Sequence, residues 1–289
     1  MVPADLVGRC AFPDPGTEVT AAVSGGADSL ALLVLARAAG LRVTAVHVDH
    51  GLRPGSAAEA DVVAAAADRY GAAFRAVTAP VDAGPNLEER ARRARWVALP
   101  EGACTGHTLD DRAETVLVNL LRGAGATGLG ALRPGPRHPL LALRRAETHA
   151  LCAAEGLTPV QDPSNDDPRF VRNRVRHEVL PLLEAVAGRD LAPVLARQAE
   201  LLADDADLID ALAAALDPTD ALALVAAPRP LARAALRAWL RSAGGGHPPS
   251  AAAVDRVLAV AAGDHVATEI AGGWRVRRSG QRLHLDPPP

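Results

Sequence analysis

The sequence contains no lysine, so arginine supplies all 31 of its positively charged side chains other than histidine. Codon bias is the ordinary explanation, because arginine and alanine are both over-used. Aromatic residues make up only 2% of the 289 residues, although 49% are hydrophobic, so alanine, leucine and valine must fill any core. The formal net charge is −3. This value excludes binding of nucleic acid through overall charge, and any such binding needs local arginine clusters.

Cysteine is also scarce, with three residues, at positions 10, 104 and 152, that form no CxxC pair. This spacing argues against a zinc site or a disulfide framework and favours a reducing compartment. No run of about 18 uncharged apolar residues is present, so no membrane-spanning segment is predicted. The first 16 residues lack the apolar segment of a signal peptide. We therefore expect a cytoplasmic protein with no membrane partner.

Short apolar segments alternate with amphipathic segments over the first 120 residues. Strands are predicted at 17–23, 42–48, 73–79 and 103–106, and helices at about 27–39, 56–71, 86–99 and 108–123. Alternation at these lengths predicts an α/β fold with a doubly wound parallel sheet, Rossmann-like in its layout. The ligand site of such a fold is expected beyond the carboxyl ends of the strands.

The pattern changes after about residue 184. Alanine-rich helical segments follow, and the chain ends in a strand-like tail over 265–287. We therefore predict two domains, with a catalytic domain over residues 1–184 and a small, mainly helical domain over residues 185–289.

The segment SGGADS, residues 24–29, stands between the first predicted strand and the first helix. Two glycines at such a turn let the backbone approach a ligand closely, and the amides and dipole of the following helix attract an anion. The hydroxyls of Ser24 and Ser29 add donors. Asp28 fits a phosphate site if a cation such as Mg²⁺ accompanies the phosphates. The segment lacks GK[ST] and GxGxxG, so it is neither a Walker motif nor a dinucleotide fingerprint.

SGGADS resembles the pyrophosphate loop of the N-type ATP pyrophosphatases, or PP-loop enzymes, which split ATP into AMP and pyrophosphate while adenylating a substrate. Further segments narrow the resemblance to the tRNA(Ile)-lysidine synthases. They are HVDHGLRPGS at 47–56, NLEERARRARW at 86–96, TGHTLDDRAETVLVNLLRGAGATGLGAL at 105–132 and QDPSNDDPRFVRNRVRHEVLPLL at 161–183. The resemblance covers roughly residues 17–184.

Two carboxylates share one face of the helix predicted from residue 108, because Asp111 and Glu114 are three residues apart. Such a pair repels unless a cation lies between the carboxylates, and a free lysine substrate would supply one. A solvated acidic face is the alternative. His107 ends the fourth predicted strand and is expected to face the same crevice.

The resemblance implies roles for three groups of residues. ATP is expected to bind to Ser24, Gly25, Gly26, Ala27, Asp28 and Ser29, with backbone of His47 near the adenine and Mg²⁺ on Asp28. The expected catalytic residues are Asp28, Arg95, His107, Asp111 and Glu114, of which Asp111 and Glu114 would bind L-lysine. The expected tRNA contacts are Arg92, Arg172, Asn173, Arg174 and Arg176, because guanidinium groups suit phosphates and stack on bases.

The implied substrate is the cytidine at the first anticodon position of an isoleucine tRNA with a CAU anticodon. ATP would adenylate O2 of the cytosine and release pyrophosphate, and an amine of free L-lysine would then attack C2 and expel AMP. The mainly helical domain would bind tRNA, and relatives suggest a homodimer.

Two alternative functions are considered, one an enzyme and the other a binding module. A PP-loop tRNA thiolase needs persulfide or cluster cysteines, which three scattered cysteines do not supply. A nucleotide-binding module without catalysis is disfavoured by the DDxxE and RNxxR segments.

Overall fold

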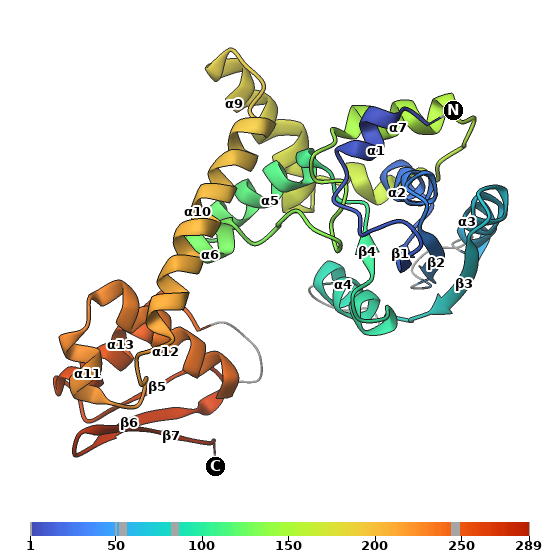
Figure 1. Ribbon diagram of the computed structural model, residues 1–289. Helices are drawn as coiled ribbons and strands as arrows, with labels where there is room; N and C mark the ends of the chain where they lie inside the picture. The colour runs from blue at the N-terminus through green and yellow to red at the C-terminus, as the bar shows by residue number, and fades with distance from the viewer. Residues whose placement is uncertain (1, 50, 52–56, 82–86, 244–248, 289) are drawn as a thin grey trace. The chain divides into compact units, whose positions relative to one another are not determined.

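The computed structural model describes residues 2–49, 51, 57–81, 87–243 and 249–288 (Figure 1). The chain divides into two compact units, Met1–Leu201 and Leu202–Pro289. The domain boundary expected at residue 184 precedes this division. The division lies inside α10 (Ala192–Ala213), which runs from the first unit into the second.

The first unit is built on a four-stranded sheet with the order β3-β2-β1-β4. Its strands are β1 (Glu18–Ala22), β2 (Arg42–Asp49), β3 (Ala73–Thr78) and β4 (Cys104–Thr105), and all three pairings are parallel. The predicted α/β fold with a parallel sheet is therefore confirmed. Because the strands run in one direction, their carboxyl ends meet at one edge of the sheet.

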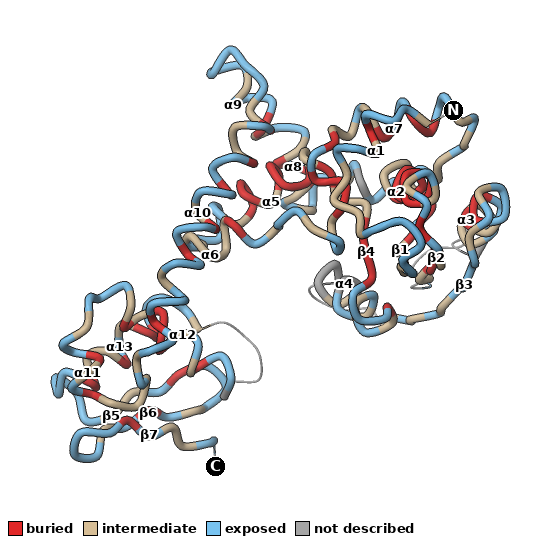
Figure 2. The backbone as a smooth tube through the Cα atoms, viewed as in Figure 1, coloured by how far each residue is buried: buried red, intermediate tan, exposed pale blue. Residues whose placement is uncertain are grey.

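Helices connect and cover these strands at the predicted places: α2 (Ala27–Ala38), α3 (Ala57–Arg69), α4 (Leu87–Ala98) and α5 (Leu109–Leu121). The centre of the core is α2, in which every residue from Ser29 to Ala36 is buried (Figure 2). This burial on all sides explains why its sequence is a continuous apolar run and not a one-sided stripe.

The sequence did not predict α7 (Arg145–Ala154), which packs against α2 through its buried residues Thr148, Leu151 and Cys152. Smaller helical elements complete the first unit. They are α1 (Ala4–Gly8), α6 (Ala126–Leu129), a 3-10 turn (Pro163–Asp166), and α8 (Val171–Arg174), which continues through a π-helical turn (Val175–Val179) into α9 (Leu180–Ala187).

The second unit combines helices with a small antiparallel sheet. Its helices after α10 are α11 (Ala221–Ala226), α12 (Arg229–Ala243) and α13 (Ala251–Ala262). The chain then forms β5 (Ala267–Glu269), a 3-10 turn (Ala271–Gly273), β6 (Arg275–Ser279) and β7 (Arg282–Asp286), in the order β5-β6-β7. The predicted small, mostly helical unit with a strand-like tail is confirmed. Within the described ranges, no helix has both the length and the apolar character to cross a membrane.

The close approach of Gly106, directly after β4, to the first turn of α2 gives a first prediction. A Cβ on Gly106 would lie 2.6 Å from the backbone oxygen of Asp28. Gly106→Ala must therefore move one of the two backbones, and overpacking of this kind costs ~1–3 kcal/mol of unfolding free energy. Urea denaturation measures the loss. The control is Gly8→Ala, where nothing lies within 4 Å of the new Cβ. Equal stability of the two variants would contradict this close packing.

Candidate active site

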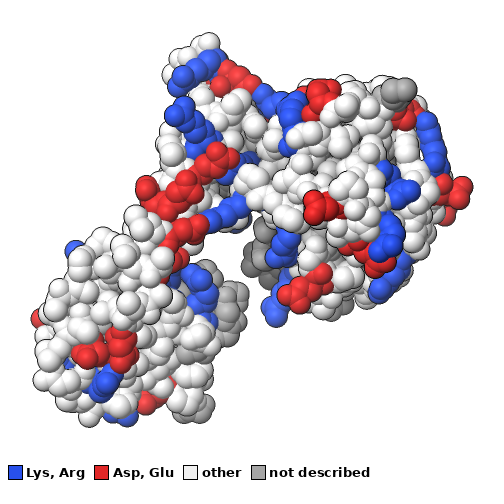
Figure 3. All heavy atoms as spheres, viewed as in Figure 1, with Lys and Arg blue, Asp and Glu red and all other residues white. Residues whose placement is uncertain are grey.

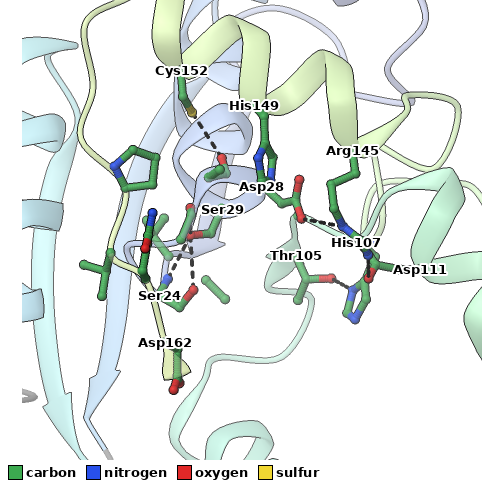
Figure 4. Close-up of a pocket in the computed structure, with 18 of the residues that line it drawn as sticks. Ser24, Asp28, Ser29, Thr105, His107, Asp111, Arg145, His149, Cys152 and Asp162 are labelled. Atoms are coloured by element: carbon green, nitrogen blue, oxygen red, sulfur yellow. Dashed lines mark hydrogen bonds and ion pairs between the residues drawn. The ribbon is translucent and has the colours of Figure 1, made fainter. Parts of the chain in front are cut away.

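A pocket of about 790 Å³ opens at the carboxyl ends of the parallel strands (Figure 4). Residues that end or follow three strands line it, among them Val23 after β1, Val48 in β2 and Thr105 in β4. This is where the parallel sheet predicts a ligand site.

The SGGADS loop forms one wall, and its residues other than Gly25 line the pocket. Internal hydrogen bonds hold the loop. The Ser24 amide donates to Ser29 Oγ at 3.1 Å, and Ser29 Oγ donates to the Gly26 carbonyl at 2.8 Å. Gly25 has a φ of +90°, and a Cβ there would lie 3.0 Å from a methyl group of Val160. A side chain at this position would therefore be both strained and crowded, so the turn requires glycine.

His47 lies beneath the pocket and is only 2% exposed. Its Nδ1 is 3.0 Å from the carbonyl oxygen of Val23, which connects β2 to the residue that precedes the loop. Its neighbours Val46 and Val48 line the pocket, and the His47 side chain does not. The expectation that His47 acts through its backbone stays a prediction.

Arg145, at the start of α7, contacts three carboxylates that come from two other helices, and Figure 4 shows two of them, Asp28 and Asp111. Its Nη2 donates to Asp111 Oδ1 at 2.8 Å and its Nη1 donates to Glu114 Oε1 at 2.9 Å. Its Nε lies 3.7 Å from Asp28 Oδ2. Arg176 donates to both oxygens of Glu114, at 2.7 and 2.9 Å. We call these five residues the carboxylate cluster.

Asp111 also caps the first turn of α5. Thr108 is the N-cap residue, and its amide and hydroxyl donate to Asp111 Oδ2 at 2.8 and 2.9 Å. Burial alone raises the pKa of Asp111, but the charges of Arg145 and His107 and the hydrogen bonds from Thr108 outweigh it. The pKa of Asp111 therefore lies below its ordinary 3.8, and the carboxyl is ionised.

Asp28 behaves in the opposite way. Burial is the largest effect and raises the pKa of Asp28, and the nearby charge of Asp111 adds to it. The hydrogen bond that Thr148 Oγ1 donates to Asp28 Oδ1, and the charge of Arg145, only partly offset this rise. A bound cation would stabilise the ionised form of Asp28.

No group of three or more His, Cys, Asp or Glu side chains within the described residues is placed to hold a metal ion. Mg²⁺ on Asp28 would therefore draw its remaining ligands from phosphate oxygens and water, which is how this ion usually binds.

The structure thus brings together most of the predicted catalytic residues. Asp28, Arg95, His107 and Asp111 all line the pocket, together with Arg145 and Arg176. Glu114 does not line it, because its side chain is only 1% exposed beneath the two arginines. The cation between Asp111 and Glu114 is therefore a guanidinium of the chain itself, and the expected lysine site on this pair stays a prediction.

The residues expected to contact tRNA have varied surroundings. Asn173 is buried and its Nδ2 donates to the carbonyls of Ser164 and Asp167, so it holds the 3-10 turn in place. Arg172 donates to Thr115 Oγ1 at 2.8 Å. Arg174 is exposed and pairs with Glu178 one helical turn away. The side chain of Arg92 lies outside the described part of the chain.

Sequence reasoning missed Arg145, Thr148 and His149. They share one face of α7, because residues three and four apart are neighbours on a helix. Arg145 and His149 line the pocket, and Thr148 binds Asp28. The available signal was RRAETHA at 144–150, a polar helix start that was not predicted as a helix.

Comparisons with known proteins agree with this geometry. Residues 7–183 match the PP-loop domain, and residues 220–284 match the TilS substrate binding domain. The chain is 45% identical to a tRNA(Ile)-lysidine synthase of Nocardia farcinica, over 81% of this chain and 78% of that one. It is 47% identical to the synthase of Mycolicibacterium paratuberculosis, over 77% and 74% of the two chains.

Among solved structures, the chain resembles the U34-tRNA thiolase NcsA of Methanococcus maripaludis, solved with its 4Fe-4S cluster. The TM-score is 0.55 at 20% identity, over 69% of this chain and 78% of that one. This likeness shows the fold, and the more distant thiolase does not favour the thiolase alternative.

The fold and the loop define a PP-loop enzyme that uses ATP. Within this class, the chain belongs to the tRNA(Ile)-lysidine synthase family.

The carboxylate cluster predicts a pH-dependent loss of stability. Arg145→Met leaves Asp111 and Glu114 with Arg176 alone, and breaking a buried ion pair costs ~3–5 kcal/mol. Burial then dominates and raises the pKa of Asp111, so protonation relieves the cost. Urea denaturation should show a large stability gap from wild type at pH 7 that narrows toward pH 4.

Arg174→Met is the matched control, because its partner Glu178 is exposed, and we expect little change at either pH. If Arg145→Met is as stable as wild type, or if its loss of unfolding free energy is the same at pH 4 and pH 7, the proposed ionisation of the cluster is wrong.

Proposed function

We propose that this chain joins L-lysine to C2 of the cytidine at the first anticodon position of a tRNA(Ile) with a CAU anticodon, at the expense of ATP. One observation supports this most strongly: the PP loop, His107 and the ionised Asp111 line a single pocket in a chain of this family. A phosphate cradle, a base and an anionic amine acceptor are the groups that adenylation followed by amine attack requires.

The loop residues would bind the phosphates of ATP. Ser24 and Ser29 present hydroxyls, and the amides at the start of α2 add the positive end of the helix dipole. Asp28 is the residue that would hold Mg²⁺, and the metal would neutralise charge on the departing pyrophosphate. The fit is supported by the raised pKa of Asp28, because a buried carboxyl of this kind gains from a cation.

The charge of the pocket suits a cationic second substrate. Its lining includes four aspartates and three arginines, so one negative charge is left over before the adjacent Glu114 is counted. These residues are Asp28, Asp111, Asp162 and Asp166, with Arg95, Arg145 and Arg176. We place the lysine ammonium against Asp111, because this carboxylate lines the pocket and Glu114 does not. In this assignment Glu114 acts by holding Arg145 and Arg176.

His107 would accept the proton that the amine loses. The charge of His107 contributes to the lowered pKa of Asp111, so the two groups lie close enough to share the amine between them. The rest of the rate enhancement would come from alignment of the base, the nucleotide and the amine, which can supply ~7–11 kcal/mol. The target cytidine lies in a single-stranded loop, so turning it into the pocket costs little.

The direct test is incubation of the protein with ATP, labelled L-lysine and total tRNA from cells that lack their own enzyme. We expect label in one isoleucine tRNA, with AMP and pyrophosphate as products. Label that enters no tRNA would refute the proposal, and sulfur transfer to uridine would support the thiolase alternative. The suggested homodimer and cytoplasmic location stay predictions.

Substitution of Asp111 tests the amine site. Asp111→Asn keeps the shape and removes the charge, and a hydrogen bond to a charged group contributes ~1.5–3 kcal/mol. The KM for lysine should therefore rise by ~10- to 100-fold. Asp110→Asn is the matched control, because Asp110 stands on the same helical turn but pairs with Arg144 and does not line the pocket. If both variants raise the KM for lysine equally, Asp111 is not the residue that binds the amine.

Binding of tRNA should weaken as salt rises, because arginines displace counterions from phosphates. Figure 3 shows arginines and acidic residues interspersed over the visible face. Arg174→Ala should lower the slope of log Kd against log salt by roughly 0.7. Arg176→Ala should instead reduce the rate of the lysine step, because Arg176 pairs with Glu114. An unchanged slope for Arg174→Ala would exclude this residue from the interface.

A further inference from the structure

Thr105, in β4, contacts two histidines that lie far apart in the sequence. Its Oγ1 is 2.6 Å from His107 Nδ1 and 2.8 Å from His138 Nδ1. The two imidazole rings meet edge to face, with centroids 5.1 Å apart and planes at 85°. The hydroxyl of Thr105 therefore lies between the two histidines.

The single hydroxyl proton of Thr105 limits how it can bond to the two histidines. A threonine hydroxyl carries one proton, and it accepts hydrogen bonds through its lone pairs. Thr105 can donate to only one of the two Nδ1 atoms, so at least one Nδ1 must donate to Thr105, and the hydroxyl also lies 3.4 Å from the Arg137 carbonyl oxygen. In the arrangement that supports proton transfer, the hydroxyl donates to one histidine and the other histidine carries its proton on Nδ1. Transfer through the hydroxyl exchanges these two states without moving any heavy atom.

The two hydrogen bonds of Thr105 connect the pocket to His138, which does not line it. His107 and Thr105 line the pocket and His138 does not. Thr105 is only 9% exposed, whereas His138 is half-buried. A proton received by His107 thus has a path to His138 that does not pass through the substrate.

The turn that carries His138 is anchored to β4. The Thr105 amide donates to the Arg137 carbonyl at 2.9 Å, and the His138 amide donates to the Gly135 carbonyl at 2.9 Å. The Arg137 guanidinium stacks over the Trp96 ring of α4, 5.1 Å from its centroid. These contacts fix His138 relative to Thr105, as a relay requires.

Charged groups from several elements surround His107. Asp111 of α5 attracts the imidazolium, and this attraction also appears in the lowered pKa of Asp111. The other ionisable side chains that line the same pocket are Asp28, Arg95, Arg145, His149, Cys152, Asp162, Asp166 and Arg176. Arg137 accompanies His138 on the turn.

We propose that His138 and Thr105 are positioning residues that discharge the His107 imidazolium formed during the lysine step and leave His107 neutral. This role rests on the proposed function. The lysine ammonium loses one proton to Nε2 of His107, and the amine lone pair then forms the C2–N bond. The C2–O2 bond breaks, its electron pair leaves on AMP, and the departing phosphate takes the second proton from the newly bonded nitrogen. His107 passes its Nδ1 proton to Thr105 Oγ1, and Thr105 passes its own proton to His138 Nδ1. His138 releases a proton to solvent.

The test isolates the lysine step. Enzyme, tRNA and ATP are mixed first, lysine is then added, and lysidine formation is followed in a single turnover between pH 6 and 9. General acid–base catalysis contributes ~10²–10⁴-fold, so cutting the relay should slow this step by at least ~10-fold. His138→Ala should be slow and should recover at least tenfold with added imidazole. Thr105→Val should be slow without such recovery, and Thr105→Ser should restore the rate by restoring the hydroxyl.

Two further variants separate the relay from simple packing. His138→Asn keeps an amide beside Thr105 but accepts no proton, so it should be as slow as His138→Ala. Thr44→Val makes the same exchange on β2, outside the pocket lining, and serves as the reference for Thr105→Val. The relay is overturned if His138→Asn reacts at the wild-type rate, if imidazole leaves His138→Ala slow, or if Thr105→Val matches Thr44→Val. Failure of the wild-type protein to incorporate lysine would instead refute the proposed function.

Discussion

The contact of Arg145 with Asp28, Asp111 and Glu114 is the interaction on which the pocket depends. Without a cation, these three carboxylates from two helices would repel one another, and burial and repulsion would raise their pKa values. Arg145 lies against all three, and Arg176 covers the second side of Glu114. With two guanidinium groups in place, Asp111 stays ionised at the edge of a cavity large enough for a nucleotide.

The same contact connects three helices that are separated in the sequence. Asp28 belongs to the loop and α2, Asp111 and Glu114 belong to α5, and Arg145 begins α7, which packs on α2. The planar guanidinium presents its donors as a fixed fork that can serve two carboxylates at once, which an ammonium group does less well. The chain contains no lysine. An ammonium group that reaches Asp111 as substrate would therefore differ in shape and hydration from the guanidinium groups that line the pocket.

Much of this fold could be predicted from the sequence because it depends on local patterns. The four strands, the helices α2 to α5 and the SGGADS turn follow from apolar alternation, capping residues and a glycine pair. The need for a cation between Asp111 and Glu114 also follows from their spacing. The residue that supplies this cation could not be predicted, because Arg145 is 31 residues from Glu114 and contacts it only through tertiary packing. The Thr105 contact with His138 was hidden for the same reason, at a separation of 33 residues.

The central claim is that the pocket keeps an ionised carboxylate available to a cationic amine. The most direct measurement is equilibrium dialysis of labelled L-lysine with the wild-type protein and a non-hydrolysable ATP analogue, with norleucine as competitor. Norleucine has the same carbon chain as lysine and lacks only the terminal ammonium. If Asp111 receives that ammonium, norleucine should bind ~10- to 100-fold more weakly than lysine. Competition by norleucine at the same concentrations as lysine would contradict the account.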